Sequence, residues 1–120
     1  MLTTDQCIEI AEKVWGAKVT EMNAGGAKYP MWYLTPNDLV SHSFLVQEVN
    51  SWQGFGRTVE AMDAKDWTLE ECCSEERYEL GDVLSFAKDE KVIQILRDEI
   101  YRPRDLIEAT HLAALEAINE

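Results

Sequence analysis

Few side chains in this chain are suited to metal or redox chemistry. The histidines are His42 and His111, and the cysteines are Cys7, Cys72 and Cys73. A structural zinc site needs four converging ligands, commonly in paired Cys or His spacings, and no CxxC or HxxxH spacing occurs here. Neighbouring strand residues point to opposite faces, so Cys72 and Cys73 are poorly placed to share one ion. We expect no metal site and no cofactor.

Nucleophilic catalysis would need a Ser or Cys beside a His that a third group orients. His111 has Ile107 and Leu115 one helical turn away on either side, which predicts a histidine packed at the edge of the core. His42 stands between two serines, but adjacency in sequence does not make a triad. Gly54-Phe55-Gly56 lacks the lysine and preceding strand of a phosphate loop. We expect no catalytic residue, and a hydrolase-like enzyme is the least favoured hypothesis.

The net charge of the chain limits the classes of partner that it is expected to bind. The net charge is −12, and residues 60–82 hold nine acids against Lys65 and Arg77. Such a charge opposes binding to nucleic acid and to anionic membranes, and it fits a basic protein partner or simple solubility. Both alternatives stay open for the acidic segment. If it is a contact surface, the sequence predicts these partner-binding residues: Glu70, Glu71, Glu75 and Glu76.

A second group of residues fits a different function. Trp32 and Tyr33 are adjacent and flanked by prolines, and Arg102 and Arg104 precede a predicted helix. Aromatic rings and arginines at a helix N-terminus suit an anionic metabolite or nucleotide. The competing interpretation places one ring of the pair in the core and pairs the arginines with the many acids of the chain. A small-ligand binder is therefore the alternative function.

The elements that must position these residues follow from periodicity. Apolar spacing predicts helices over 4–15, 52–65 and 104–119, and the second of them shows an apolar face of Trp52, Phe55, Val59 and Met62. Strands are predicted at 67–73, 83–88 and 92–97 as an antiparallel meander, and short strands are possible at 19–22 and 31–34. Residues 37–50 fit either a helix or a strand. The expectation is one α+β domain over residues 1–120, with a sheet of about three strands packed with three helices.

The sequence also bears on compartment and assembly. Three cysteines are an odd number, and the N-terminal residues lack the basic and apolar regions of a signal peptide. No apolar run approaches the ~20 residues that span a bilayer. These features predict a cytoplasmic protein with reduced thiols. The edges of its small sheet offer a way to pair as a homodimer.

Three segments resemble a family of small bacteriophage and prophage proteins, the phage ABA sandwich domain. Ile8–Gly16 is similar to the opening helix of that family, Ser51–Met62 with Trp67 to its second helix and sheet, and Ile107–Ile118 to its closing helix. The segment 37–50 and the acid-rich 70–79 depart from the family pattern. The resemblance implies helices around a small antiparallel sheet, an α-β-α sandwich, and no enzymatic activity. It favours a non-enzymatic accessory protein that binds a host or phage protein in the bacterial cytoplasm.

Overall fold

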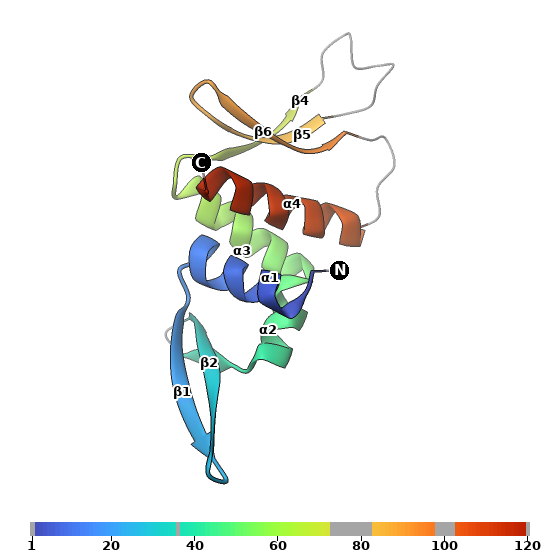
Figure 1. Ribbon diagram of the computed structural model, residues 1–120. Coiled ribbons are helices and arrows are strands. Elements are labelled where there is room, and N and C mark those ends of the chain that lie inside the picture. The colour runs from blue at the N-terminus through green and yellow to red at the C-terminus, as the bar shows by residue number, and fades with distance from the viewer. Residues whose placement is uncertain (1, 36, 73–82, 98–102, 120) are drawn as a thin grey trace.

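The computed structural model describes residues 2–35, 37–72, 83–97 and 103–119, and it is elongated, at 61 × 28 × 22 Å. The helices form a central layer, and an antiparallel sheet of three strands lies at each end of it (Figure 1). This arrangement confirms the α+β class and contains a sheet more than the sequence predicted. None of the helices in the described ranges is long and apolar enough to cross a membrane.

The first helical run confirms the prediction over 4–15 and adds a change of helix type. Helix α1 spans Thr4–Glu9, and its N-cap Thr3 forms a capping box with Gln6. A π-helix, η1, continues over Ile10–Val14, and the Trp15 N–H bonds the Ile10 carbonyl at 3.1 Å. Gly16 then ends the run with a φ of +70°, a conformation that favours glycine.

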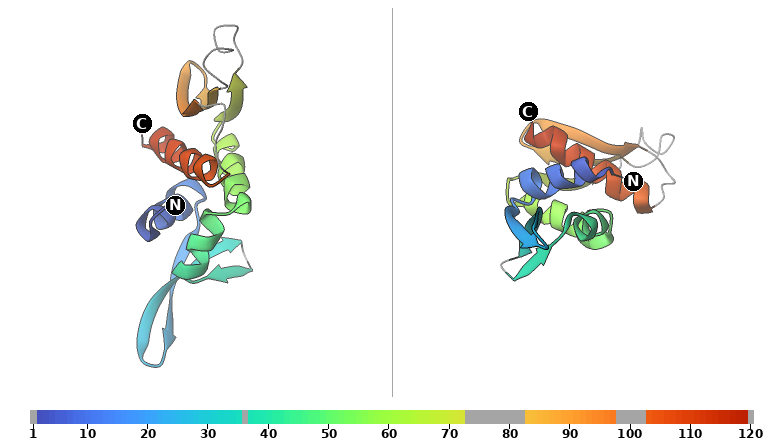
Figure 2. Two further views of the ribbon diagram at one scale, coloured as in Figure 1. Left: turned by 90° about the vertical axis from the view of Figure 1, so that its right-hand side faces the viewer. Right: turned by 60° about the horizontal axis from the view of Figure 1, so that its bottom comes forward.

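The N-terminal sheet consists of a long hairpin and a short third strand. Strands β1 (Lys18–Ala24) and β2 (Ala27–Thr35) pair antiparallel through a tight turn at Gly25 and Gly26, which both have positive φ. Strand β3 (Asp38–Val40) pairs only with the base of β2, from Trp32 onward. The outer part of the hairpin is therefore a two-stranded ribbon that projects away from the helices (Figures 1 and 2).

Helices α2 (His42–Val49) and α3 (Trp52–Asp63) resolve the ambiguous segment and correct the predicted face of the second helix. The buried side of α3 carries Gly54, Thr58 and Met62, spaced one turn apart. Trp52, by contrast, is 53% exposed, with its ring edge-on to Phe55 at 5.4 Å. The predicted face of Trp52, Phe55, Val59 and Met62 was wrong except for Met62, because small and polar residues pack inward here.

The C-terminal sheet confirms the predicted meander. Strands β4 (Thr68–Cys72), β5 (Val83–Lys88) and β6 (Lys91–Arg97) follow the order β4-β5-β6, and helix α4 (Pro103–Ile118) crosses below them. Leu69, Phe86 and Ile93 stand opposite one another in register and belong to the core against the helices. Their neighbours along each strand face the other way, so this sheet has one packed and one open face.

Candidate functional site

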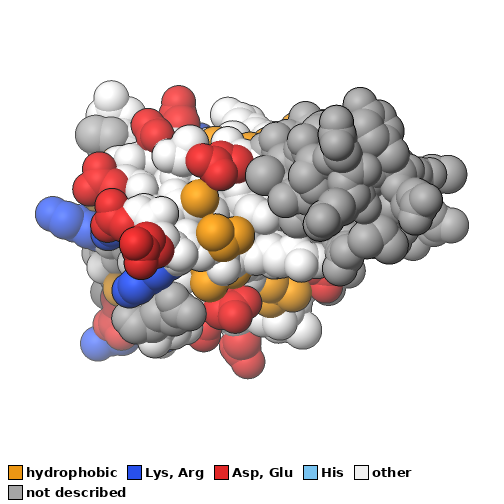
Figure 3. Space-filling view, turned by 90° about the horizontal axis from the view of Figure 1, so that it is seen from above, with side chains coloured by type: hydrophobic (Ala, Val, Ile, Leu, Met, Phe, Trp, Pro, Cys, Tyr) orange, Lys and Arg blue, Asp and Glu red, His pale blue; other side chains and the backbone are white. Residues whose placement is uncertain are grey.

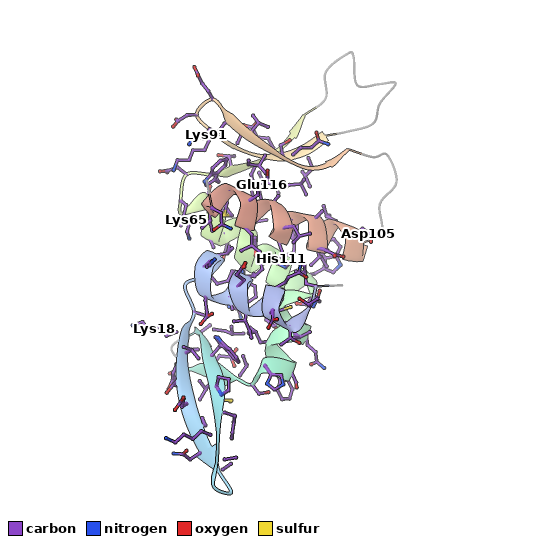
Figure 4. All side chains as sticks on the ribbon, in the orientation of Figure 1. Lys18, Lys65, Lys91, Asp105, His111 and Glu116 are labelled. Atoms are coloured by element: carbon purple, nitrogen blue, oxygen red, sulfur yellow. The ribbon has the colours of Figure 1, made fainter. Side chains whose placement is uncertain are left out.

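The pair of side chains most suited to chemistry lies in the middle of the helix layer. Thr58 Oγ1 is 2.8 Å from His111 Nδ1, and His111 Nε2 is 2.6 Å from the Val49 carbonyl oxygen. Trp15 donates its indole N–H to Thr58 Oγ1 at 2.8 Å. These contacts join the end of η1 with α3, α4 and α2, and Figure 4 shows His111 on α4 within the helix layer. The sequence placed His111 at the edge of the core and gave no sign of Thr58.

The hydrogen-bond acceptors among these contacts determine which atom carries each proton. A carbonyl oxygen only accepts, so His111 Nε2 carries the hydrogen and donates it to Val49. In the neutral ring Nδ1 is then the acceptor, and the Thr58 hydroxyl donates to it. Burial lowers the pKa of His111 to about 4, partly offset by the hydrogen bond to Val49. The ring is neutral at pH 7, and each of its nitrogens has a partner.

A Thr–His pair at 2.8 Å has the spacing of a nucleophile and its base, but substrate access decides its use. Thr58 and His111 are both 0% exposed. The half-buried Trp15 covers the outer end of the chain, and Arg57 lies over its ring at 5.8 Å while pairing with Glu48 at 2.8 Å. The arrangement ties four elements together, and neither Thr58 nor His111 lines any of the four hollows found among the described residues.

The acidic residues predicted to contact a partner are placed in part. Glu70 is exposed on β4, and Glu71 also belongs to that strand. Glu75 and Glu76 lie outside the described residues. The face that bears Glu70 is the open side of the C-terminal sheet, opposite the core. We call it the outer sheet face, and these residues form it: Thr68, Glu70, Ser85, Ala87, Val92 and Gln94. Ser85 is buried, so the exposed members of this face are Thr68, Glu70, Val92 and Gln94.

The outer sheet face combines an apolar strip with acidic surroundings. Thr68, Ala87 and Val92 stand in register across the three strands, and Val92 is 63% exposed. Asp89 and Glu90 are exposed in the turn between β5 and β6. Viewed from above, hydrophobic side chains occupy the middle of the part that the structure describes, and acidic side chains around them outnumber basic ones (Figure 3).

Of the residues predicted for a small anionic ligand, Trp32 and Tyr33 lie on opposite faces of β2. Trp32 is 3% exposed in the core, whereas Tyr33, the next residue, points to the other face of β2 and is exposed. Tyr33 borders a hollow of about 360 Å³ beside Trp15 and Leu34 at the base of the hairpin. Arg102 lies outside the described residues, and Arg104 belongs to the first turn of α4.

A hollow that the sequence did not indicate gathers three lysines. It has a volume of about 390 Å³ at the end of the helix layer beside the β5–β6 turn, and we call it the lysine hollow. The residues that line it are Lys65, Trp67, Lys88, Asp89, Lys91, Ala117 and Ile118. The Lys65 ammonium group donates hydrogen bonds to the Val14 carbonyl at 3.0 Å and to the Ala61 carbonyl at 3.5 Å. Figure 4 shows Lys65 and Lys91 at this same end of the molecule.

Comparisons with known proteins add no functional information. No family model, curated protein or solved structure matches the chain. The resemblance to phage ABA sandwich proteins therefore stays a prediction from the sequence. Within the ranges that the structure describes, no group of three or more His, Cys, Asp or Glu side chains is arranged to hold a metal ion.

Proposed function

We propose that this chain acts by binding a basic segment of another protein on its outer sheet face. The observation that carries the proposal is the open side of the β4–β6 sheet, where exposed Val92 and Glu70 share one surface. Protein contacts combine a small apolar centre with a polar rim, and this face has both. The net charge of −12 selects partners of opposite sign and speeds their encounter.

Binding in place of catalysis is supported by the closed state of the Thr58–His111 pair, which is 0% exposed. Glu70 is the member of the predicted acidic contact that this surface includes, while Glu71, Glu75 and Glu76 stay predictions from the sequence. The resemblance to phage ABA sandwich proteins supports an accessory role in a bacteriophage or prophage. It also supports the cytoplasm of the bacterial host as the site of action.

Reversing one charge on the outer sheet face tests this proposal. The probe is a fluorescent peptide of alternating arginine and valine, about eight residues long, which in extended form presents its charges on one face. Glu70→Lys is expected to weaken peptide binding about tenfold, because it replaces an attraction of roughly 0.7 kcal/mol with a repulsion of similar size. Fluorescence anisotropy measures the Kd, and added salt is expected to raise it.

The matched control is Glu12→Lys, since Glu12 is exposed on η1, in the helix layer, and its reversal changes the net charge equally. A local contact predicts that Glu12→Lys alters the Kd less than twofold, by the long-range field alone. Equal weakening by both variants, or no measurable binding by the unmodified protein, would contradict the proposal.

A second candidate function, binding of a small anion, is favoured by the lysine hollow. Three of the eleven basic residues of an acidic chain meet there, against the single acid Asp89. Among the described residues, the Lys88 and Lys91 ammonium groups form no ion pair. Ala117 and Ile118 provide an apolar wall. A ligand with a carboxylate or phosphate and a small apolar part has the matching chemistry.

Inorganic phosphate and benzoate are the probes for this candidate, and thermal unfolding is the measurement. A ligand that binds the folded state raises the free energy of unfolding and with it the Tm. Either anion, at a concentration about 100 times its Kd, is expected to add about 2.7 kcal/mol to the free energy of unfolding. The double variant Lys88→Gln with Lys91→Gln is expected to lose that rise, while Lys13→Gln with Lys28→Gln, two exposed lysines elsewhere, retains it. An unchanged Tm with both probes, or a rise that both variants share, argues against an anion site here.

A further inference from the structure

We infer that the β1–β2 hairpin is a dimerisation arm, on which a second copy of this chain packs face to face. The surface is the side of the hairpin that carries Met22, Tyr29, Met31 and Tyr33, which we call the hairpin face. This inference concerns the opposite end of the molecule from the outer sheet face and does not depend on the proposed function (Figure 1).

The register of the hairpin separates an apolar side from a polar one. Residues that stand directly opposite in an antiparallel pair share a face. Met22 stands opposite Tyr29, and Thr20 opposite Met31, so these side chains project together. On the other side Glu21 stands opposite Pro30, and Asn23 opposite Lys28. At the base of the hairpin Lys18 stands opposite Tyr33 on the first side, and Val19 stands opposite Trp32 on the second, so the two sides differ most in the outer part. The hairpin is thus amphipathic, like a strand pair that covers a core.

No core lies under the hairpin face. Met22, Tyr29 and Tyr33 are 39%, 38% and 40% exposed, and they are three of the eight large exposed hydrophobic residues of the described chain. Helix α2 and strand β3 contact the base of β2, where the other side of the ribbon buries Trp32. A two-stranded ribbon alone is marginally stable in water, so a partner on its apolar side would stabilise it. Clustered exposed apolar residues of this kind mark interaction surfaces.

The charge distribution favours the hairpin as the place where two copies meet. The hairpin, residues 18–35, carries Lys18, Lys28 and Glu21, a net charge of +1. The rest of the chain, which we call the body, therefore carries a net charge of −13, and with the +1 of the hairpin this gives the total of −12. The bodies of two copies repel each other. The hairpin is the end of the molecule where two copies meet without bringing their acidic bodies together.

The length of the hairpin is sufficient for this arrangement. Seven residues of β1 extend about 23 Å at roughly 3.3 Å per residue. Two hairpin faces stacked antiparallel about a two-fold axis place the bodies at opposite ends, farther apart than the Debye length of about 8 Å at physiological salt. Each Met22–Tyr29 pair then packs against its counterpart, and stacked β-layers lie about 10 Å apart.

Analytical ultracentrifugation of the full chain tests the inference. The unmodified protein is expected to sediment as a dimer, at twice the chain mass of 13.7 kDa. Met22→Thr with Tyr29→Thr keeps strand propensity and removes the apolar pair, so it is expected to give folded monomers with an unchanged circular dichroism spectrum. Asn23→Thr with Lys28→Arg changes the opposite pair on the polar side and is expected to leave the dimer intact.

The dependence of the dimer on salt concentration gives an independent test of the inference. Repulsion between the acidic bodies is screened as salt rises, so the dimer is expected to tighten, whereas binding of a basic peptide to the outer sheet face weakens. A dimer that M22T/Y29T leaves intact, or that the two double variants disrupt equally, would overturn the inference. So would a monomer at every concentration tested. Any of these outcomes leaves the peptide-binding proposal standing.

Discussion

Replacing Gly54 with alanine is expected to destabilise the protein by about 3 kcal/mol and to lower its Tm by about 10 °C or more. A Cβ at this position would collide with the Glu48 carbonyl oxygen and would lie 2.7 Å from the Val49 carbonyl oxygen. Both are backbone atoms of α2, so α2 and α3 would have to separate. The Val49 carbonyl is also the acceptor for His111, so the same shift disturbs the buried hydrogen-bond chain. Urea unfolding followed by circular dichroism measures the loss.

The matched control for this prediction lies two residues further along the same helix. A Cβ at Gly56 meets nothing within 4 Å. Gly56→Ala is therefore expected to stabilise the protein by about 0.5–1 kcal/mol, because alanine loses less backbone entropy in a helix than glycine. If the two alanine variants have equal stability, the close approach of α2 and α3 is not as described.

Acidification is expected to remove roughly 2–3 kcal/mol of stability through His111 between pH 7 and pH 4.5. Burial lowers the pKa of His111 to about 4 in the folded state, against the ordinary value of 6.5. Between these values the unfolded chain binds a proton that the folded chain does not, so stability rises with pH. The contribution is complete above pH 6.5 and is lost as pH falls toward 4. Urea unfolding at a series of pH values measures the effect.

The variant His111→Gln isolates the contribution of His111 from every other effect of pH on stability. The variant is expected to be less stable at pH 7, because glutamine does not reproduce both ring contacts. The two stability curves should converge as the pH falls. Parallel curves would contradict a neutral buried imidazole. Direct titration of the His111 ring by NMR in the unmodified protein, with an expected pKa of about 4, decides the point even if the variant fails to fold.

Local sequence patterns predicted the elements whose contacts are local. The β4–β6 meander, α4 and the first helical run followed from alternation and apolar spacing. The N-terminal sheet was only partly predicted, because residues 37–50 fit two patterns. Pro30 is tolerated within β2 because β3 pairs only beyond it, so its missing N–H faces no strand.

Long-range contacts explain what the sequence missed. The inward side of α3 is determined by the contact of Gly54 with α2 and by the hydrogen bond of Thr58 with His111. A prediction from hydrophobicity alone therefore chose the wrong side of the helix. Lys65, Lys88 and Lys91 come from two separate turns and meet only in the folded chain. The apolar side of the hairpin depends on strand register, which places Met22 opposite Tyr29.

The most direct test of the account is a chemical-shift map of the isotope-labelled protein during titration with the arginine–valine peptide. Binding on the outer sheet face predicts that the amide signals of Thr68, Glu70, Val92 and Gln94 shift together with one saturation curve, while those of the hairpin stay in place. Shifts spread evenly over the exposed acidic residues of all elements, or confined to surfaces other than the β4–β6 sheet, would contradict it.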